Sequence, residues 1–432
     1  MRPIMYAARS YAASAVVIAA TVAPVAAQPA ATPVASVTHL SMDDAVRLAL
    51  ARNPSIAAQR LDVDASKADE ITAGLKPNPS VSFGADGLAL FSPRRLTPSF
   101  LGNDVSYSGT LDYTFERGGK RDRRMTVAAD TTNVTAQNVL DAERQLRFDT
   151  RQAFINVLLA KASSDLAADN LQSFSQVVDI NQQRVQAGDI AEADFYRISL
   201  QKLAFQQDVS AAAVALVQAK AALRQLVGYE SVADTFDVDG TLTYAPETAT
   251  LDDLKQAALA TRPDLAAAER AASLARDAAA LERANRARDV GGELSYTHTG
   301  PDNAIGVGVG IDLPIHDRNQ GNIAHADVAV RQAEVTVAAT RTAVLTDVVN
   351  AYAAFQTSRD VVELFQSGYL DQAQQSLDIS RYVYQQGSGT LLDLLDAERT
   401  YRDTQVGYLQ ALAAYMTSVQ QINLAVGKQV MP

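Results

Sequence analysis

The chain has 432 residues, no cysteine and a formal net charge of −11 at pH 7. The lack of cysteine excludes disulfides and thiolate zinc sites, and the negative charge argues against nucleic acid as a partner. The sequence contains no P-loop, no His-Glu-x-x-His and no Gly-x-Ser-x-Gly motif, so we expect neither an enzyme with catalytic residues nor a cofactor.

The first 27 residues have the pattern of a secretory signal. Arg2 and Arg9 precede an apolar, small-residue run that ends in Val25-Ala26-Ala27, a typical cleavage site. This run is too short for a membrane-spanning helix, and no other stretch approaches 18 uninterrupted apolar residues. We therefore predict an exported chain with a signal peptide over residues 1–27 and a Pro/Ala linker over residues 28–40.

The rest of the chain is written twice, over residues 41–228 and 251–427, with a connector over 229–250. Matching residues lie 209 positions apart at the start of the two units and 199 apart at their ends: Asp43 and Asp252, Pro54 and Pro263, Gly188 and Gly387, Gly228 and Gly427. The spacing changes because one loop is longer in the first unit. A duplication of this kind indicates a repeated structural unit.

Each unit begins with a predicted helix and continues with two strand-like runs. The first helix covers about residues 42–75 and is ended by Pro77, because proline cannot continue a helix. The four strands are predicted over about 81–91, 105–116, 290–299 and 305–313. Residues 105–116 alternate between apolar and polar without a fault, and each strand has about the length of a tilted membrane strand.

The strand over residues 105–116 carries aromatic side chains on one face. Tyr107, Tyr113 and Phe115 are predicted to face lipid; the alternative is the surface of a soluble β-sandwich. A basic cluster follows the strand, and it is predicted either to reach lipid headgroups or to be a solvated helix start. Its members are Lys120, Arg121, Arg123 and Arg124.

Two long proline-free stretches predict long helices. No proline occurs between Pro98 and Pro246 or between Pro314 and Pro432, and good helix formers dominate both stretches. We expect helices over about 121–187 and 320–386, each on the order of 100 Å long, which turn at a glycine and return as a second helix. The second returning helix has residues seven apart, as in a coiled-coil seam: Leu394, Tyr401, Tyr408, Tyr415 and Ile422.

The duplicated strand-strand-helix-helix plan, the export signal and the segment 384–397 together resemble the TolC-type outer-membrane factor family. Four strands cannot close a barrel alone, because lipid does not tolerate open sheet edges. The resemblance implies a mainly α fold with a β-barrel part: a homotrimer with a 12-stranded barrel in the outer membrane, continued by an α-helical coiled-coil tunnel through the periplasm. The segment 115–121 resembles the branch that serves heavy-metal efflux pumps, the cobalt–zinc–cadmium resistance type.

The resemblance also implies a function. The chain is expected to be the outer-membrane channel of a tripartite, proton-driven (RND-type) efflux system, and to export divalent heavy-metal cations passively. Its implied partners are a periplasmic adaptor protein, an inner-membrane RND-type pump and outer-membrane lipid. Two alternatives remain: an outer-membrane channel for drug or protein export, and, from another class, a periplasmic adaptor (membrane fusion) protein.

The start of the returning helix carries the candidate gate. Asp393 and Asp396 share one helix face, and three copies would place their carboxylates in an acidic ring that selects cations. The alternative for Asp393 is helix capping, because Thr390 and Asp393 have the spacing of a capping box. The equivalents in the first unit are Asp194 and Arg197, whose opposite charges predict a salt bridge across the closed tip.

The hairpin tips are the predicted docking surface for the adaptor: Gly188, Asp189, Ile190, Gly387, Ser388, Gly389 and Thr390. The alternative is that the glycines only permit the turn. His316 and His325 lie close to Asp317 in the sequence but match no known metal-site spacing, so no metal site is predicted.

Overall fold

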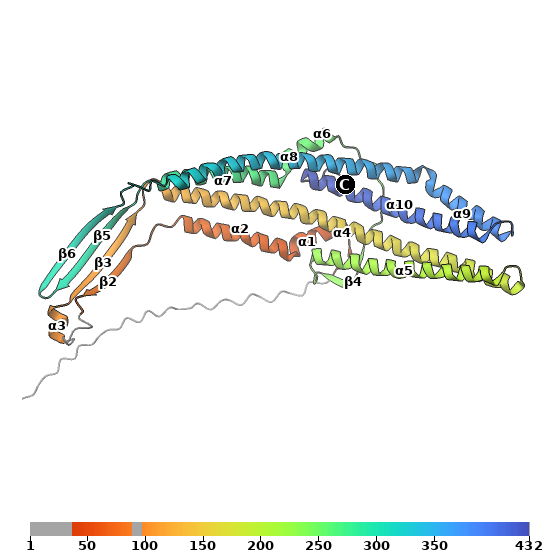
Figure 1. Cartoon of the computed structure of the whole chain (residues 1–432), viewed down its shortest axis with the longest axis horizontal. Helices are drawn as coiled ribbons and strands as arrows, with labels where there is room; N and C mark the ends of the chain where they lie inside the picture. Colours follow the sequence, from red (N-terminus) through yellow and green to blue (C-terminus); the bar gives the residue numbers. More distant parts are fainter. Residues whose placement is uncertain (1–36, 89–96, 432) are drawn as a thin grey trace, which may run out of the picture. The chain divides into compact units, whose positions relative to one another are not determined.

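Helices make up most of the part of the chain that the structure, a computed structural model, describes: residues 37–88 and 97–431 (Figure 1). The predicted signal peptide and residues 28–36 of the predicted linker lie outside the described residues. The first unit contains, in chain order, β1 (Val37–Leu40), α1 (Met42–Arg52), α2 (Pro54–Ala73), β2 (Ser80–Asp86), α3 (Pro98–Asn103), β3 (Ser106–Phe115), α4 (Lys120–Ala187) and α5 (Glu192–Val227).

The second unit repeats this order after strand β4 (Val232–Val238). It contains α6 (Leu251–Thr261), α7 (Pro263–Asn285), β5 (Val290–Thr299), β6 (Asp302–Ile311), α8 (Gln320–Leu364), the π-helical turn η1 (Phe365–Tyr369), α9 (Leu370–Gln385) and α10 (Leu391–Val426). In each unit two helices lead to two long strands, and the strands lead to a long helical hairpin.

The helix expected over residues 42–75 is broken, and the same break occurs in the second unit. Pro54 begins α2 and Pro263 begins α7. The residues before them have extended backbones, Asn53 with ψ 121° and Arg262 with ψ 119°. The single-helix prediction was wrong because a proline ring excludes the helical conformation from the residue before it.

Strands β2, β3, β5 and β6 form one antiparallel sheet in that order. Strand β2 ends at Asp86, whereas the prediction continued to residue 91; residues 89–91 lie outside the described part. Strand β6 begins and ends earlier than predicted. A second sheet pairs β1 with β4 in parallel, so residues 37–40 form a strand where a linker was predicted. These residues form a strand because β4, almost 200 residues later in the chain, supplies the hydrogen-bonding partners.

The four-stranded sheet has one apolar and one polar face. The pairing register places these residues on the apolar face: Val81, Phe83, Tyr107, Leu111, Tyr113, Phe115, Leu294, Tyr296, Ile305, Val307, Val309 and Ile311. The opposite face carries mostly serine, threonine and glycine, with Asp112 beside Glu293. Ile305, Val307 and Val309 are 76%, 81% and 80% exposed, so a single chain leaves the apolar face uncovered.

Helix α4 holds the helical part together. It packs against α5, α2, α7 and α10. Towards the hairpin tips the helices follow the order α5, α4, α10, α9, and near the sheet the order α2, α4, α7, α8 (Figure 1). Large buried side chains such as Phe154 in the first unit and Phe355 in the second fill the space between these helices.

The second long helix, expected over residues 320–386, is interrupted. Helix α8 ends at Leu364, and the turn η1 precedes α9. Within η1, Gly368 has φ 119°, a backbone conformation that a residue with a side chain rarely adopts. In the first unit α4 continues for 68 residues without a break.

Candidate gate at the hairpin tips

Both hairpins turn on a glycine with a left-handed backbone. Gly188 has φ 82° and Gly387 has φ 73°. A Cβ atom at either position would meet nothing within 4 Å, so the backbone conformation alone requires these two glycines. Gly389 differs, because a Cβ there would lie 3.1 Å from the Tyr384 nitrogen and from a Val383 methyl group. The tips are therefore tightly built, and docking of an adaptor on them remains a prediction.

Asp393 is bound into the cap of α10. Its backbone N–H donates to Thr390 Oγ1 at 3.1 Å, and its carboxylate accepts from the Thr390 hydroxyl at 2.6 Å. The capping box stabilises the first turn of the helix and fixes the direction of the carboxylate. Asp396 is exposed and, within the described residues, makes no hydrogen bond or ion pair. Asp396 is therefore the carboxylate of this pair that has no partner in the described residues, and its place in an acidic ring remains a prediction.

The equivalent residues of the first unit neutralise one another. Arg197 Nη1 lies 3.2 Å from Asp194 Oδ1, three residues earlier on α5. The bond joins two positions of one helix, whereas the sequence predicted a bridge across the tip. The Asp194–Arg197 pair of the first unit therefore contributes no net charge, whereas Asp393 and Asp396 of the second unit both contribute a negative charge.

A hydrogen bond between buried side chains joins the two hairpins near their tips. The Tyr384 hydroxyl on α9 donates to Asn181 Oδ1 on α4 at 2.8 Å. Burial raises the pKa of Tyr384 above its ordinary value, so the hydroxyl stays protonated and keeps donating. The Arg184 guanidinium lies 5.3 Å from the centre of the same ring. We call the Tyr384–Asn181 pair the tip latch.

Sequence reasoning missed the tip latch. Asn181 is one of several polar residues on a long helix, and no local pattern marks it as buried. The only signal was that Tyr384 begins the segment 384–397 on which the family resemblance rests. A second link between the hairpins, from Arg402 on α10 to Asp208 on α5 at 3.2 Å, was missed for the same reason.

The basic cluster after β3 is partly bound at the junction between the sheet and the helices. Lys120 Nζ lies 2.9 Å from Asp289, and Arg124 donates to Glu116. Arg121 Nε donates to the Gly74 carbonyl at 2.6 Å. These bonds tie the ends of β3 and β5 to α4, so the cluster orients the sheet; contact with lipid headgroups remains a prediction.

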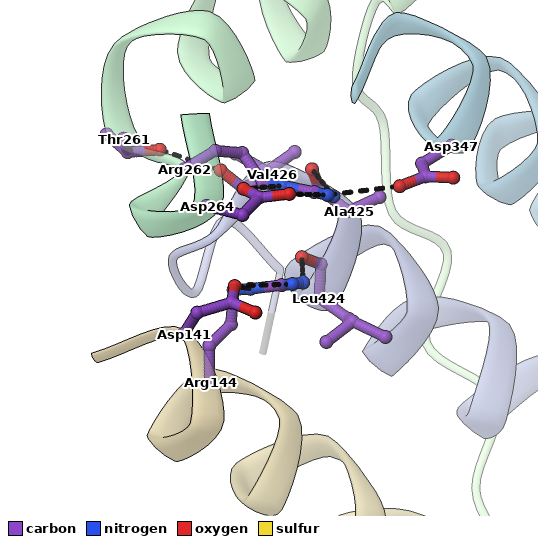
Figure 2. Close-up of polar contacts among 9 residues, drawn as sticks. All are labelled: Asp141, Arg144, Thr261, Arg262, Asp264, Asp347, Leu424, Ala425 and Val426. Atoms are coloured by element: carbon purple, nitrogen blue, oxygen red, sulfur yellow. Dashed lines mark hydrogen bonds and ion pairs between the residues drawn. The ribbon is translucent and has the colours of Figure 1, made fainter. Parts of the chain in front are cut away.

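Two buried arginines hold the last turn of α10 (Figure 2). Arg144 on α4 donates to the Leu424 carbonyl at 2.7 Å and pairs with Asp141. Arg262, between α6 and α7, donates to the Ala425 carbonyl at 3.1 Å. The last carbonyls of a helix have no partner within it, and a cationic donor at this end also interacts favourably with the helix dipole. The arginines therefore fix the position at which α10, and with it the second hairpin, ends.

Arg262 also binds two carboxylates, Asp264 at 2.6 Å and Asp347 at 3.1 Å. Burial pushes the pKa of Asp264 upward, but the hydrogen bonds and charge of Arg262 outweigh it, so this pKa lies below its ordinary value of 3.8. The first unit makes the same contact with a neutral residue: Asn53 donates to the Leu226 carbonyl at 3.0 Å. The duplication has kept the contact and changed its chemistry.

Within residues 37–88 and 97–431, no three histidine or acidic side chains gather into a group that could hold a metal ion. None of the helices in these ranges combines the length and the apolar character needed to cross a membrane. The residues predicted to form the gate and the docking surface lie at the hairpin tips. The contacts that join the two hairpins, the tip latch and the Arg402–Asp208 pair, lie on the facing helices.

A family model described as outer membrane efflux protein matches residues 45–229 and 254–428. The chain belongs to the outer membrane efflux protein family. This membership confirms the family expected from the sequence and places the chain in the outer membrane. The alternative of a periplasmic adaptor is wrong.

One relative of this outer membrane efflux protein is the cobalt-zinc-cadmium resistance protein CzcC of Cupriavidus metallidurans, 24% identical over 393 residues, which are 90% of each chain. Solved structures of similar fold include CusC, with a TM-score of 0.74 at 20% identity over 90% of this chain and 92% of that chain. The open state of MtrE from Neisseria gonorrhoeae has a TM-score of 0.72 at 20% identity, over 90% of this chain and 89% of that chain. The CmeC channel of Campylobacter jejuni has a TM-score of 0.75 at 15% identity, over 90% of this chain and 87% of that chain.

Proposed function

We propose that this efflux protein is the outer-membrane channel of a tripartite, proton-driven system, and that it exports divalent heavy-metal cations passively. The observation that carries the channel is the incomplete sheet: four strands with one uncovered apolar face and two open edges. The resistance protein CzcC supports the metal cargo. The pump supplies the energy, and the adaptor contacts the hairpin tips.

The sheet supplies one part of a barrel wall. Its apolar face meets lipid and its polar face, with Asp112 and Glu293, meets water. The edges β2 and β6 have unpaired backbone groups, which a membrane does not tolerate. Three copies joined edge to edge give a closed barrel of 12 strands, in which Tyr107, Tyr113 and Phe115 face outward.

The helical part closes in the same way. Helices α5 and α9 lie at the two ends of the row α5, α4, α10, α9. The face of α5 that points away from α4 is apolar and exposed, with Tyr196, Leu200 and Leu203, and α9 exposes Ile379 and Tyr382. Side chains of this kind need a cover, and α5 of one copy against α9 of the next closes a ring of three.

A disulfide between copies tests this ring. Tyr196 follows Gly188 by eight residues and Ile379 precedes Gly387 by eight, so the two lie at the same level above the tips. Because the chain has no cysteine, Tyr196→Cys with Ile379→Cys is expected to give a covalent trimer on a non-reducing gel. Each single variant, and Tyr196→Cys with Ile71→Cys on α2, serve as controls. A trimer in detergent that never cross-links would contradict the α5–α9 contact.

The cargo is tested in cells that lack the gene. The wild-type chain is expected to restore tolerance to zinc, cobalt and cadmium. Asp396→Asn should restore it only in part, because the uncharged amide does not attract cations at the tip as the carboxylate does. Asp371→Asn, an exposed carboxylate on α9, is the control and should restore full tolerance. If cells without the gene keep normal metal tolerance but lose drug tolerance, the cargo is drugs and the metal proposal is refuted.

A further inference from the structure

A small cavity lies where the last turn of α10 meets α4 and α1, beside the contact between Arg144 and Leu424 that Figure 2 shows. Its volume is about 190 Å³, which is far more than a single water molecule needs. Side chains of both units line it: those on α1 and α4 belong to the first unit, and those on α10 and residues 427–429 belong to the second. A ligand in this cavity therefore contacts both units.

The lining of the cavity is basic. Arg144, Arg147, Arg151 and Lys428 all line it, and none of the described residues in the lining is acidic. The chain as a whole, by contrast, has a net charge of −11. Cationic side chains that converge on one cavity repel one another unless an anion lies between them. The lining therefore points to a negatively charged ligand.

The cations of the lining differ in how well they are paired. Arg144 is neutralised by its aspartate partner on α4. Arg147 shares a carboxylate, because Glu143 lies 3.7 Å from Arg147 but only 2.7 Å from Arg60. Lys428 is exposed and forms no ion pair in the part of the chain that the structure describes. Arg147 and Lys428 can therefore turn towards an anion in the cavity.

Arg151 is a largely buried cation with an unused donor. Its Nη1 donates to Gln420 at 2.9 Å and its Nη2 to Gln429 at 3.1 Å, so both partners are neutral amides. Its Nε is buried and has no hydrogen-bond partner within residues 37–88 and 97–431. Burial lowers the pKa of Arg151 below its ordinary value, and Asp43, whose charge opposes the shift, forms no ion pair with it. An oxyanion would accept from the free N–H and supply the missing counter-charge.

The repeated fold does not require a cation at this place. Because Gly228 matches Gly427, the first unit has Tyr229 and Glu230 where the second has Lys428 and Gln429. The returning helix of the first unit therefore ends without a lysine in the equivalent position. The basic residue is a property of the second unit and not of the turn that both units share.

We propose that this cavity, which we call the anion pocket, binds an oxyanion of the phosphate class that joins the end of α10 to α4. Arg151 Nε, Arg147 and Lys428 hold the oxyanion, and a doubly charged ion balances the cations that lack a close counter-charge. The guanidinium fork matches phosphate in both geometry and charge. Headgroups of the membrane do not reach the pocket, because Arg147 follows Lys120 at the start of α4 by 27 residues, or roughly 40 Å.

Titration calorimetry of the purified protein in detergent tests the anion pocket. Sodium phosphate is the probe, and sodium chloride of equal ionic strength is the blank. The wild-type protein is expected to bind phosphate at one site per chain. Arg151→Gln should weaken this binding by about tenfold, because a hydrogen bond to a charged group is lost. Arg331→Gln, which removes an exposed positive charge on α8, is the matched control and should leave phosphate binding unchanged.

A second variant separates ligand binding from folding. Arg151 also binds two glutamines, whereas Arg147→Gln with Lys428→Gln leaves those contacts in place and should still weaken phosphate binding. Phosphate should also raise the midpoint of thermal unfolding more in the wild-type protein than in this double variant, because a ligand that binds only the folded state stabilises it. Equal shifts in the two proteins would contradict the proposed joint between α10 and α4.

The choice of ligand decides the remaining outcomes. A folded wild-type protein that binds no phosphate refutes the anion pocket, as does equal binding in the wild-type protein and both pocket variants. Acetate that binds more tightly than phosphate would overturn the phosphate class. Glycerol 3-phosphate distinguishes two sources that both support the proposal: binding as tight as that of phosphate indicates a phosphate ester, and no binding indicates the free ion. None of these measurements involves transport, so their failure would leave the proposed channel function untouched.

Discussion

Replacing Arg262 with alanine is expected to lower the free energy of unfolding by about 3–5 kcal/mol, the usual effect of removing one partner of a buried ion pair. Arg262 is 6% exposed, and its guanidinium binds Asp264, Asp347 and the Ala425 carbonyl. Its loss leaves the half-buried Asp264 carboxylate without its arginine partner and the Ala425 carbonyl at the end of α10 without this donor. Denaturant unfolding of the purified protein in detergent, followed by circular dichroism, measures the change.

The first unit supplies a matched rescue. Arg262→Asn copies Asn53, which binds the equivalent carbonyl at 3.0 Å, so this variant should lose clearly less stability than Arg262→Ala. Arg331→Ala, an exposed residue of α8, should change the free energy of unfolding by less than about 0.5 kcal/mol. Equal losses for the alanine and asparagine variants would show that the contact to α10 contributes nothing.

The same pair predicts an acid dependence. The pKa of Asp264 is lowered in the folded protein, so its contribution is present above the ordinary pKa of 3.8 and is lost as the pH falls through the lowered value. The wild-type protein should therefore lose stability below about pH 4 more steeply than Arg262→Ala, in which the cause of the shift is gone. Parallel pH profiles of the two proteins would contradict this cause.

Replacing Tyr384 with phenylalanine is expected to raise the open fraction of the channel at least tenfold. The variant leaves the buried Asn181 oxygen without its donor in the closed state, which costs about 1–3 kcal/mol, and a tenfold change in an equilibrium corresponds to about 1.4 kcal/mol. Because three copies close one tunnel, the effects of the three latches combine. Single-channel conductance measures the open fraction.

A second tyrosine on the same helix provides the control. Tyr382 is 63% exposed, so Tyr382→Phe should leave the conductance unchanged. Asn181→Leu with Tyr384→Phe replaces both polar partners by apolar side chains, and should close the tip better than Tyr384→Phe alone because no buried oxygen is left unpaired. An unchanged conductance in Tyr384→Phe would mean that other contacts hold the tip closed.

Sequence reasoning reached the family through a resemblance, which the duplicated plan, the export signal and the segment 384–397 carry together. It failed where a break is made by a single residue. Pro54 divides a segment that was predicted as one helix, and Gly368 does the same in the second unit. Neither residue changes the apolar pattern around it, so the pattern does not reveal the break. It also failed for β1, whose four residues are too few to show an alternation.

What the sequence by itself determined is local: two units, strands of period two, long helices between prolines, and the cap of α10 at Thr390 and Asp393. Apart from the two units, which are recognised from matches about 200 positions apart, each of these depends on residues a few positions apart. Only the tertiary structure decided which polar residues meet, such as Tyr384 with Asn181 or Arg262 with the end of α10. Those partners are about 160 to 200 residues apart, and many polar residues on the same helices are equivalent by sequence until packing brings two faces together.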